Sequence, residues 1–323
     1  MDDLGKRQYK GNAECHYQPL AGAWSEPEPY IAAKSLTDAV NAALYLRRPL
    51  LLEGDPGCGK TRLAYAVAYE LGYPLHTCYV RSSSRAQDLL YDYDALARLY
   101  DIQENKAAPS PIAKSRQDYI TWGKLGEAIK SSQNDCPSVV LIDEIDKADI
   151  DFPNDLLLEL DRLQFQVKEV PQMNFDALKG KKRQERQEFL PLIIVTSNRE
   201  KEMPKPFLRR CLFYYVEFPD REGLKQILLS HFPPLTPLSQ LTPIFEVALT
   251  KFLELRELRN WRKIPGTSEF LDWVAILERD HQAEKLTVEQ LENTDPVNLP
   301  YLGALVKTQS DRNALNQSTN PNG

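Results

Sequence analysis

The segment from Gly54 to Thr61 has the residue types and the spacing of a loop that binds phosphate groups. It reads GDPGCGKT, which matches the pattern G-x-x-x-x-G-K-[ST]. Glycines let backbone N–H groups close around phosphate oxygens, and a following helix adds its partial positive charge. Lys60 is expected to reach the β- and γ-phosphates, and the Thr61 hydroxyl to be a ligand of Mg²⁺. The predicted nucleotide-binding residues are Gly54, Asp55, Pro56, Gly57, Cys58, Gly59, Lys60, Thr61 and Arg62.

Two carboxylates follow a short apolar run further along the chain. The segment VVLIDE, residues 139–144, ends in Asp143 and Glu144, at the carboxyl end of a predicted buried strand. Ligands of open α/β sheets bind along this edge. Asp143 is expected to hold Mg²⁺ through coordinated water, and Glu144 to act as a general base that orients the attacking water. Many P-loop kinases lack a glutamate beside the aspartate, so the pair favours hydrolysis over transfer to a second substrate.

Three further polar residues are candidates for the same site. Asn198 ends the apolar run LPLIIVTSN, where it either begins a turn or holds the attacking water with its side-chain amide. The second role requires its strand to lie beside the other two, and the sequence alone does not give the strand order. The segment PFLRRC contains Arg209 and Arg210 at a predicted helix end, where basic residues most often only interact favourably with the helix dipole.

The elements that must position these residues alternate between apolar runs and amphipathic helical patterns. The runs expected to be strands are 49–54, 75–80, 138–143, 190–198 and 212–218. Such alternation predicts an α/β fold with a parallel sheet covered on both faces. Beyond residue 219 only helical patterns follow, which predicts a separate helical domain. Residues 1–29 have neither period, so we expect an irregular arm there.

Two insertions interrupt the alternation. Residues 81–121 are polar and tyrosine-rich, with a loop-like segment KAAPSPIAKS. Residues 164–189 contain the alternating run LQFQVKEV and then the basic run LKGKKRQERQ, which together resemble a hairpin with a long charged tip. A solvated loop is the favoured interpretation of that charge, ahead of a binding site.

Composition excludes several classes of protein. The 323 residues have a net charge of −6, which predicts no general attraction to nucleic acid. No apolar run approaches the roughly 20 residues needed to span a bilayer, and the first residues lack the apolar core of a secretory signal, so we expect a cytoplasmic protein. The five cysteines and four histidines lack metal-ligand or disulfide spacing. The polar residues 308–323 are expected to be disordered.

Taken together, these motifs resemble the AAA+ ATPases, with a Walker A motif at 54–61, a Walker B motif at 139–144 and a sensor 1 asparagine at Asn198. Within that group the chain resembles the MoxR branch over about residues 30–305. The similar segments are YLRRPLLLEGDPGCGKT, YITWGKLGEAI, LIDEIDKADIDFPNDLLLELD and FLRRCLFYYVEFPD. The resemblance implies a three-layer αβα P-loop NTPase core over 30–218, with a five-stranded parallel sheet in order 5-1-4-3-2. A small all-helical lid domain over 219–307 would follow.

The resemblance also implies roles for residues outside the loop. The insertions match the position of the family's helix-2 insert and of its hairpin before sensor 1, which in related machines face a pore or a partner. Arg210, with Arg209 in reserve, is implied to act in trans on the γ-phosphate held by a neighbouring subunit, in a homo-oligomeric ring expected to be a hexamer. Glu269 stands about where the family has its sensor 2 arginine, so either Arg262 or Lys263 takes that role or the site lacks this contact.

The expected function is therefore ATP hydrolysis that remodels or activates a partner complex, as in MoxR-type proteins, whose partner often has a von Willebrand factor A domain. ATP is favoured over GTP because no N-K-x-D motif is present; the nearest segment is NKAA at 105–108. One alternative is a nucleotide-gated signalling or assembly switch with little turnover, for example in a bacterial defence system. A second alternative is a nucleic-acid motor that uses the run at 178–187 as its contact, and the net charge disfavours it.

Overall fold

The computed structural model describes residues 4–107, 114–232, 241–258 and 261–318, and the chain forms two compact units. The first unit consists of Met1–Glu28, Ala32–Glu53 and Lys60–Tyr215. The second consists of Pro29–Ile31, Gly54–Gly59 and Val216–Gly323. Each unit has a hydrophobic core of its own.

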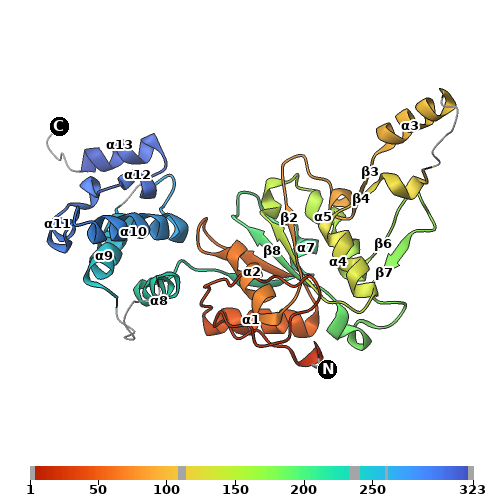
Figure 1. The fold of residues 1–323 in the computed structure, drawn as a ribbon, viewed down its shortest axis with the longest axis horizontal. Helices are drawn as coiled ribbons and strands as arrows, with labels where there is room; N and C mark the ends of the chain where they lie inside the picture. Colours follow the sequence, from red (N-terminus) through yellow and green to blue (C-terminus); the bar gives the residue numbers. More distant parts are fainter. Residues whose placement is uncertain (1–3, 108–113, 233–240, 259–260, 319–323) are drawn as a thin grey trace. The chain divides into compact units, whose positions relative to one another are not determined.

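A five-stranded parallel sheet forms the centre of the first unit (Figure 1). The strands are β1 (Leu50–Glu53), β2 (Leu75–Tyr79), β5 (Val139–Asp143), β8 (Leu192–Ser197) and β9 (Leu212–Tyr215). Their order is β2-β5-β8-β1-β9, and every neighbouring pair is parallel. The predicted α/β class and the order 5-1-4-3-2 are therefore confirmed, with β8 between the strands that lead to the two motifs.

Two of the three inner strands, β5 and β8, are buried along their whole length. Their sequences are continuous apolar runs and not alternating ones because a parallel sheet is covered on both faces. Ile142 is the register partner of Val195, so the residues that follow them, Asp143 and Thr196, emerge side by side at the carboxyl edge. The register of the core thus decides which polar side chains meet.

Three longer helices pack against this sheet. They are α1 (Lys34–Leu46), α2 (Lys60–Leu71) and α4 (Lys124–Gln133). Helix α2 begins directly after the glycine-rich loop and buries an apolar stripe that includes Leu63 and Val67 against β2, β5 and β8. It ends at Leu71 and is followed by Gly72, whose φ of +62° is the left-handed conformation that terminates helices. The short helices α5 (Phe152–Asp155), α6 (Leu157–Arg162) and α7 (Lys205–Leu208) complete the helical layers.

The N-terminal arm is fastened to the far end of α2. Apart from the 3₁₀ turn η1 (Leu4–Lys6), described residues before α1 form neither helix nor strand. The buried carboxylate of Glu70 accepts backbone N–H bonds from Lys10, Gly11 and Ala13 at 2.8–3.0 Å. Arg7 donates to the carbonyl oxygen of Leu71 at 2.5 Å, so the arm also satisfies a free carbonyl at the helix end.

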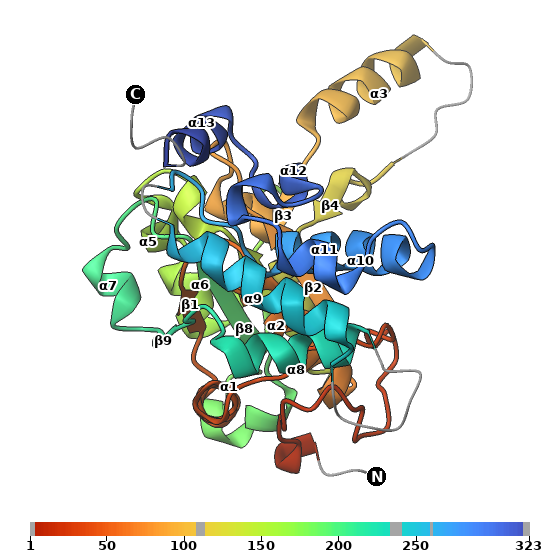
Figure 2. The ribbon, with the colours of Figure 1, turned by 90° about the vertical axis from the view of Figure 1, so that its left-hand side faces the viewer.

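The first insertion contains an antiparallel strand pair and a helix. Strand β3 (Tyr91–Tyr93) pairs with β4 (Ile120–Trp122). Helix α3 (Ala95–Ala107) lies between these two strands in the sequence and projects away from the central sheet (Figures 1 and 2). The 3₁₀ turns η2 (Ala86–Leu89) and η3 (Arg116–Tyr119) flank these elements. Most of the segment KAAPSPIAKS, expected to be a loop, lies outside the described residues.

The second insertion forms the predicted hairpin, but its basic run is elsewhere. Strands β6 (Gln164–Gln166) and β7 (Asn174–Asp176) pair antiparallel. The run LKGKKRQERQ follows β7 and leads into the turns η5 (Arg183–Glu185) and η6 (Gln187–Phe189), so the prediction of a charged tip was wrong. Arg186 is 4% exposed and donates to the carbonyl oxygens of Ser132 and Ala177. Part of the run is therefore structural, because its arginines satisfy buried backbone carbonyls.

The second unit is helical after residue 216. Its described helices are α8 (Arg221–His231), α9 (Pro243–Glu257), α10 (Thr267–Gln282), α11 (Val288–Glu292), α12 (Leu302–Leu305) and α13 (Gln309–Ser318), with the turn η7 (Pro296–Asn298). Phe252 of α9 stacks on Phe270 of α10 with ring centroids 4.3 Å apart, and Trp273 is fully buried beside them. Across the described residues, no helix has the length and apolarity to cross a bilayer.

The prediction of a disordered tail over 308–323 was wrong for residues 309–318, which form α13. Leu315 is buried in the core of the second unit. The buried carboxylate of Asp311 accepts the N–H groups of Arg262 and Lys263 at 2.7 and 3.2 Å. These tertiary contacts order a helix whose polar composition gives little local signal. Residues 319–323 lie outside the described part of the chain.

Candidate functional site

The phosphate loop lies between the end of β1 and the start of α2. Gly57 and Gly59 have φ angles of +80° and +91°, which residues with a Cβ rarely adopt. Lys60 opens α2, and only 6% of it is exposed. A buried lysine at the N-terminus of a helix of 12 residues adds its charge to the positive end of the helix dipole, and this combination binds phosphate.

Other residues of the predicted set are placed differently. Cys58 is buried within the loop, so it is a packing residue and not an exposed thiol. The side chain of Arg62 is directed to the N-terminal arm, where it pairs with Glu28 at 3.2 Å, and it is 64% exposed. The side chain of Arg62 therefore contacts the N-terminal arm and not the phosphate loop in this structure.

Asp143, the last residue of β5, contacts both the helix that follows the phosphate loop and the neighbouring strand β8. Its Oδ1 atom accepts a hydrogen bond from the Thr61 hydroxyl at 2.9 Å and another from the Thr196 hydroxyl at 2.7 Å. Asp143 is 8% exposed, so these bonds lie largely out of water. Thr196 is not among the predicted site residues, although a polar residue inside a continuous apolar run is a signal that could have revealed it.

These oxygen atoms fit a divalent cation. Mg²⁺ prefers hard oxygen ligands and is usually held by one or two protein oxygens together with water and phosphate. The hydroxyl of Thr61 and the carboxylate of Asp143 already lie within hydrogen-bond distance. No cluster of three or more histidine, cysteine or acidic residues suited to a metal occurs in the described part of the chain. A magnesium ion held jointly with a nucleotide is the cation that this donor set suits.

Glu144 is held by three neighbours. Its backbone has φ +57° and ψ +52°, a left-handed conformation that costs a non-glycine residue about 1–2 kcal/mol. Its N–H donates to the Thr196 hydroxyl at 2.8 Å, and its Oε1 accepts from Nδ2 of Asn198 at 3.1 Å. The Lys147 ammonium forms an ion pair with Oε2, and this hydrogen bond raises the pKa of Lys147.

Asn198 is brought to Glu144 by the strand order. It follows β8, which lies between β5 and β1, so its side chain reaches the carboxyl edge beside the Walker B strand. Its backbone N–H donates to Oδ2 of Asp146 at 3.0 Å. The structure thus brings together four of the predicted residues, namely Thr61, Asp143, Glu144 and Asn198.

The two candidate arginines have different surroundings. Arg210 forms an ion pair with Asp161 of α6 and donates to the carbonyl oxygen of Pro206 at 3.3 Å. Arg209 is exposed, and its side chain has no polar partner among the described residues. Both lie after α7, on the surface of the first unit, where a neighbouring molecule could meet them.

The lid candidates are engaged within the second unit. Lys263 pairs with Oε1 of Glu269 at 3.2 Å, while Oε2 of Glu269 accepts the N–H of Gly266 at the start of α10. Arg256, which sequence analysis did not consider, lies over the ring of Phe218 at 3.4 Å. Burial lowers the pKa of Arg256, and the charge of Asp55 in the phosphate loop opposes this effect.

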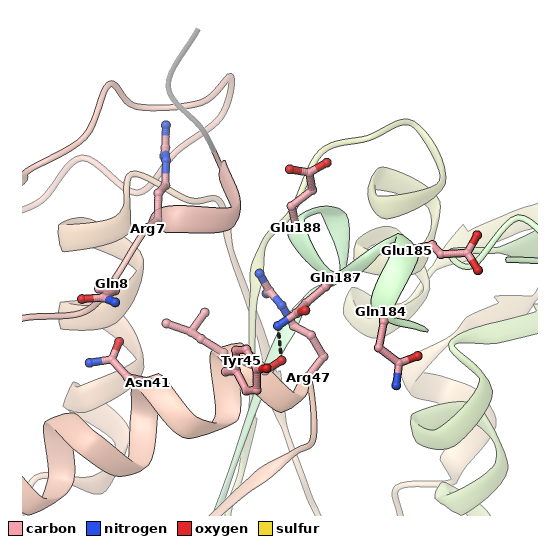
Figure 3. Close-up of a pocket in the computed structure, with 10 residues that line it drawn as sticks. Arg7, Gln8, Asn41, Tyr45, Arg47, Gln184, Glu185, Gln187 and Glu188 are labelled. Atoms are coloured by element: carbon pink, nitrogen blue, oxygen red, sulfur yellow. Dashed lines mark hydrogen bonds between the residues drawn. The ribbon is translucent and has the colours of Figure 1, made fainter. Parts of the chain in front are cut away.

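A separate cavity of about 390 Å³ lies in the first unit between α1, the arm and the turns η5 and η6 (Figure 3). It contains none of the predicted site residues. Two of its polar side chains bind backbone of the same chain: Arg47 donates to the carbonyl oxygen of Leu190 at 2.7 Å, and Gln187 donates to that of Tyr45. We assign no ligand to this cavity.

Comparison with known proteins agrees with this geometry. The sheet order and the phosphate loop define a P-loop nucleotide-binding domain of the AAA+ class. The family pattern "AAA domain (dynein-related subfamily)" matches residues 49–211, about half of the chain. The chain belongs to this family, and among the AAA+ ATPases it is of the MoxR type.

Two individual proteins illustrate the similarity. Protein CbbQ of Allochromatium vinosum is 34% identical over 77 residues, which are 24% of this chain and 86% of that sequence. The solved structure of C. elegans PCH-2 is similar with a TM-score of 0.42 and 17% identity, over 90% of this chain and 68% of that one.

Proposed function

We propose that the chain binds ATP with Mg²⁺ and hydrolyses it to ADP and phosphate, and that this reaction remodels or activates a partner protein complex. The observation that carries the proposal is the contact between three motifs: Thr61 donates to Asp143, and Asn198 donates to Glu144. Membership of the AAA+ ATPases supports nucleotide hydrolysis as the reaction. The absence of an N-K-x-D motif from the sequence supports ATP as the nucleotide.

Each residue has a task that follows from its position. Backbone N–H groups of the loop and the Lys60 ammonium bind the phosphates, and Thr61 with Asp143 would hold Mg²⁺. When bound, Mg²⁺ neutralises negative charge on the β- and γ-phosphate oxygens. Glu144 orients the attacking water and accepts its proton, while the Asn198 amide fixes the carboxylate and the water relative to each other.

Lys147 adds a condition to this mechanism. Its ion pair occupies Oε2 of Glu144, and Asn198 occupies Oε1, so both carboxylate oxygens have protein partners in this arrangement. We infer that one of these contacts opens when water takes its place beside the γ-phosphate. Both Lys147 and Glu144 are about two-fifths exposed, so their ion pair is weak enough to open at little cost.

The hydrolysis proposal is tested by steady-state phosphate release. Lys60→Ala should abolish nucleotide binding, and Glu144→Gln should retain binding while turnover falls by about 100-fold or more, because a neutral amide cannot accept the proton. Glu185→Gln, an exposed carboxylate in η5, is the matched control and should behave as wild type. Undiminished turnover in Glu144→Gln would rule out the assignment of the base.

We further propose that the active form is a head-to-tail ring, expected to be a hexamer, in which Arg210 or Arg209 completes the site of the next subunit. An arginine that acts in trans requires such an oligomer, since each site borrows from its neighbour. A von Willebrand factor A-domain protein is the kind of partner that we expect. Identification of the proteins encoded beside this one, followed by co-purification with and without ATP, tests that choice. The cytoplasmic location likewise stays a prediction of the sequence.

A nucleotide-gated switch is the second candidate, and the Lys147–Glu144 ion pair favours it. While Lys147 and Asn198 occupy both carboxylate oxygens of Glu144, this base does not contact water, which suits a protein that changes its assembly on binding ATP and turns over slowly. Light scattering with ADP, ATP and a non-hydrolysable analogue, beside turnover, separates the two functions. Assembly without turnover would support the switch. The nucleic-acid motor loses support because Arg183 and Arg186 of its expected contact run donate to backbone carbonyls of this chain.

A further inference from the structure

The turn that follows β8 is held by a buried side chain of the neighbouring motif. This turn consists of Asn198, Arg199 and Glu200, and Arg199 has a left-handed φ of +60°. The N–H groups of Asn198 and Glu200 both donate to Oδ2 of Asp146, at 3.0 and 2.8 Å. One oxygen atom thus fixes two peptide groups on either side of a strained residue, and the conformation of the turn depends on it.

Asp146 has surroundings that an ordinary surface aspartate lacks. It lies in the 3₁₀ turn η4 (Ile145–Lys147), two residues after Glu144, and it is 1% exposed. Its Oδ1 atom is enclosed and has no hydrogen-bond partner among the described residues. Its charge also adds to the burial that raises the pKa of Glu53 at the end of β1. An enclosed oxygen atom without a hydrogen-bond partner lowers the stability of the fold. The two hydrogen bonds of Asp146 to the turn are therefore the contacts that favour a carboxylate at this position.

The same turn carries the side chain that reaches the proposed base. The backbone of Asn198 is bonded to Asp146, and its Nδ2 atom lies 3.1 Å from Oε1 of Glu144. Two residues of one short segment therefore bind Asn198: Asp146 binds its backbone N–H, and Glu144 binds its side-chain amide. A shift of its peptide group would displace the amide from Glu144, since the side chain is short and has only two rotatable bonds.

A second contact joins the same two segments. The Lys201 ammonium donates to the carbonyl oxygens of Lys147 and Ala148, at 3.2 and 2.6 Å. The segment after the Walker B strand and the segment after β8 are thus connected at several points, of which Asp146 is the buried one. Exposed Lys201 reinforces the connection, but it does not contact Asn198.

We propose that Asp146 is a positioning residue that sets the Asn198 amide against Glu144 and thereby supports the hydrolysis step. The inference rests on the proposed function, because it assigns Asp146 a task in that same site. Asp146 touches neither nucleotide nor water in this scheme and acts only through Asn198. Asparagine at this position would keep an oxygen acceptor for both N–H groups, whereas alanine would remove it.

The test compares turnover with nucleotide affinity in Asp146→Ala, Asp146→Asn and a matched control. Glu70→Ala is that control, because Glu70 is also a buried carboxylate that accepts several backbone N–H bonds, but it holds the arm. Asp146→Ala should lower kcat by about 10- to 100-fold and leave the Kd of a fluorescent ATP analogue within about twofold. Asp146→Asn should recover most of kcat, and Glu70→Ala should leave kcat unchanged although its Tm falls.

A double-mutant cycle with Asn198→Ala identifies the route of the effect. If Asp146 acts through Asn198, Asp146→Ala has no further effect on kcat once Asn198 is alanine. Additive losses, an unchanged kcat in Asp146→Ala, or an Asp146→Asn variant as impaired as the alanine variant would each overturn the proposal. Should Asp146→Ala fail to fold, Asp146→Leu, which has a similar shape but no oxygen acceptor, takes its place under the same criteria.

Hydrogen exchange separates this proposal from the proposed function. If wild-type protein shows no turnover, the hydrolysis proposal fails, yet the exchange of peptides covering residues 196–202 still reports on the turn. Those amides should exchange slowly in wild type and in Glu70→Ala, and at least about 10-fold faster in Asp146→Ala. Equal protection in Asp146→Ala and wild type would show that Asp146 does not hold the turn.

Discussion

Arg210 forms an ion pair with Asp161 of its own chain, whereas the side chain of Arg209 has no polar partner among the described residues. The partners of the ion pair are 42% and 45% exposed, so the pair contributes at most about 1 kcal/mol. Asp161 therefore holds Arg210 in a defined place without preventing a stronger partner, such as a phosphate, from taking it.

We expect Arg210→Ala to assemble normally and to lose about 10³-fold or more in turnover, because a trans-acting arginine stabilises the charge of the transition state. Arg209→Ala is the adjacent control and should retain most activity. Asp161→Asn should leave turnover near wild type, since it only frees Arg210. The measurements are ATPase rates beside the oligomer mass from light scattering.

Mixing variants gives the sharper form of this experiment. Subunits with Arg210→Ala still have an intact Glu144, and subunits with Glu144→Gln still have an intact Arg210. Mixed rings should regain part of the activity that both pure variants lack, because one subunit completes the other's site. A fully active Arg210→Ala protein would place the trans-acting residue elsewhere.

Thr196→Val should weaken both stability and turnover. The substitution keeps the shape of the side chain but removes the hydroxyl that donates to Asp143 and accepts from the N–H of Glu144. A buried N–H without a partner costs about 1–3 kcal/mol in the free energy of unfolding, which urea denaturation measures. Thr77→Val in β2 is the matched control, because no hydrogen bond of its hydroxyl is present in the described structure. Equal effects of the two substitutions would contradict a special role for Thr196.

The stability of the chain should fall as the pH drops below about 6.5, partly through His76. Burial lowers the pKa of His76 below its ordinary value of 6.5. The negative charge of Glu127, whose Oε2 atom lies 3.3 Å from Nδ1 of His76, opposes this shift. Between the two pKa values the unfolded chain binds more protons than the folded one, so unfolding becomes easier as pH falls. Urea midpoints at several pH values should show a shallower dependence in His76→Asn than in wild type.

Cys15 should be the thiol that reacts first at pH 8. It is exposed, whereas burial raises the pKa of Cys78 and of Cys211 to about 12, and burial also raises the pKa of Cys136. A thiol reacts as its thiolate, so the two cysteines with pKa values of about 12 should stay unmodified in the folded protein. Mass spectrometry after brief alkylation, with Cys15→Ser as the control, measures this order. Alkylation of Cys78 at the rate of Cys15 would contradict it.

The sequence predicted the sheet because its signals are local. The aliphatic runs ending at Asp143 and Ser197 are long enough to be buried strands and are followed by polar residues, so their existence required no tertiary information. The position of Asn198 beside Glu144 required more, namely the strand order, which the family resemblance supplied.

The remaining features depend on contacts between distant residues. Thr196 meets Asp143 only through the register of two parallel strands, and Arg186 reaches Ser132 across 54 positions of sequence. Helix α13 is ordered by a buried leucine and by a carboxylate that binds the backbone of residues 262 and 263. None of these pairings leaves a periodic pattern, so sequence analysis mistook the helix for a tail and the arginines for a solvated loop.

The attachment of the N-terminal arm to Glu70 has an evolutionary consequence. The carboxylate recognises three peptide N–H groups, so side-chain identity at positions 10 and 13 does not enter the contact. Gly11 differs, because its φ of +71° and the nearby Ala32 leave no room for a Cβ. Among related chains we therefore expect the arm to diverge freely in composition while its length, its glycine and the glutamate are inherited together. An alignment of orthologues would record the attachment as fixed spacing between positions 11 and 70.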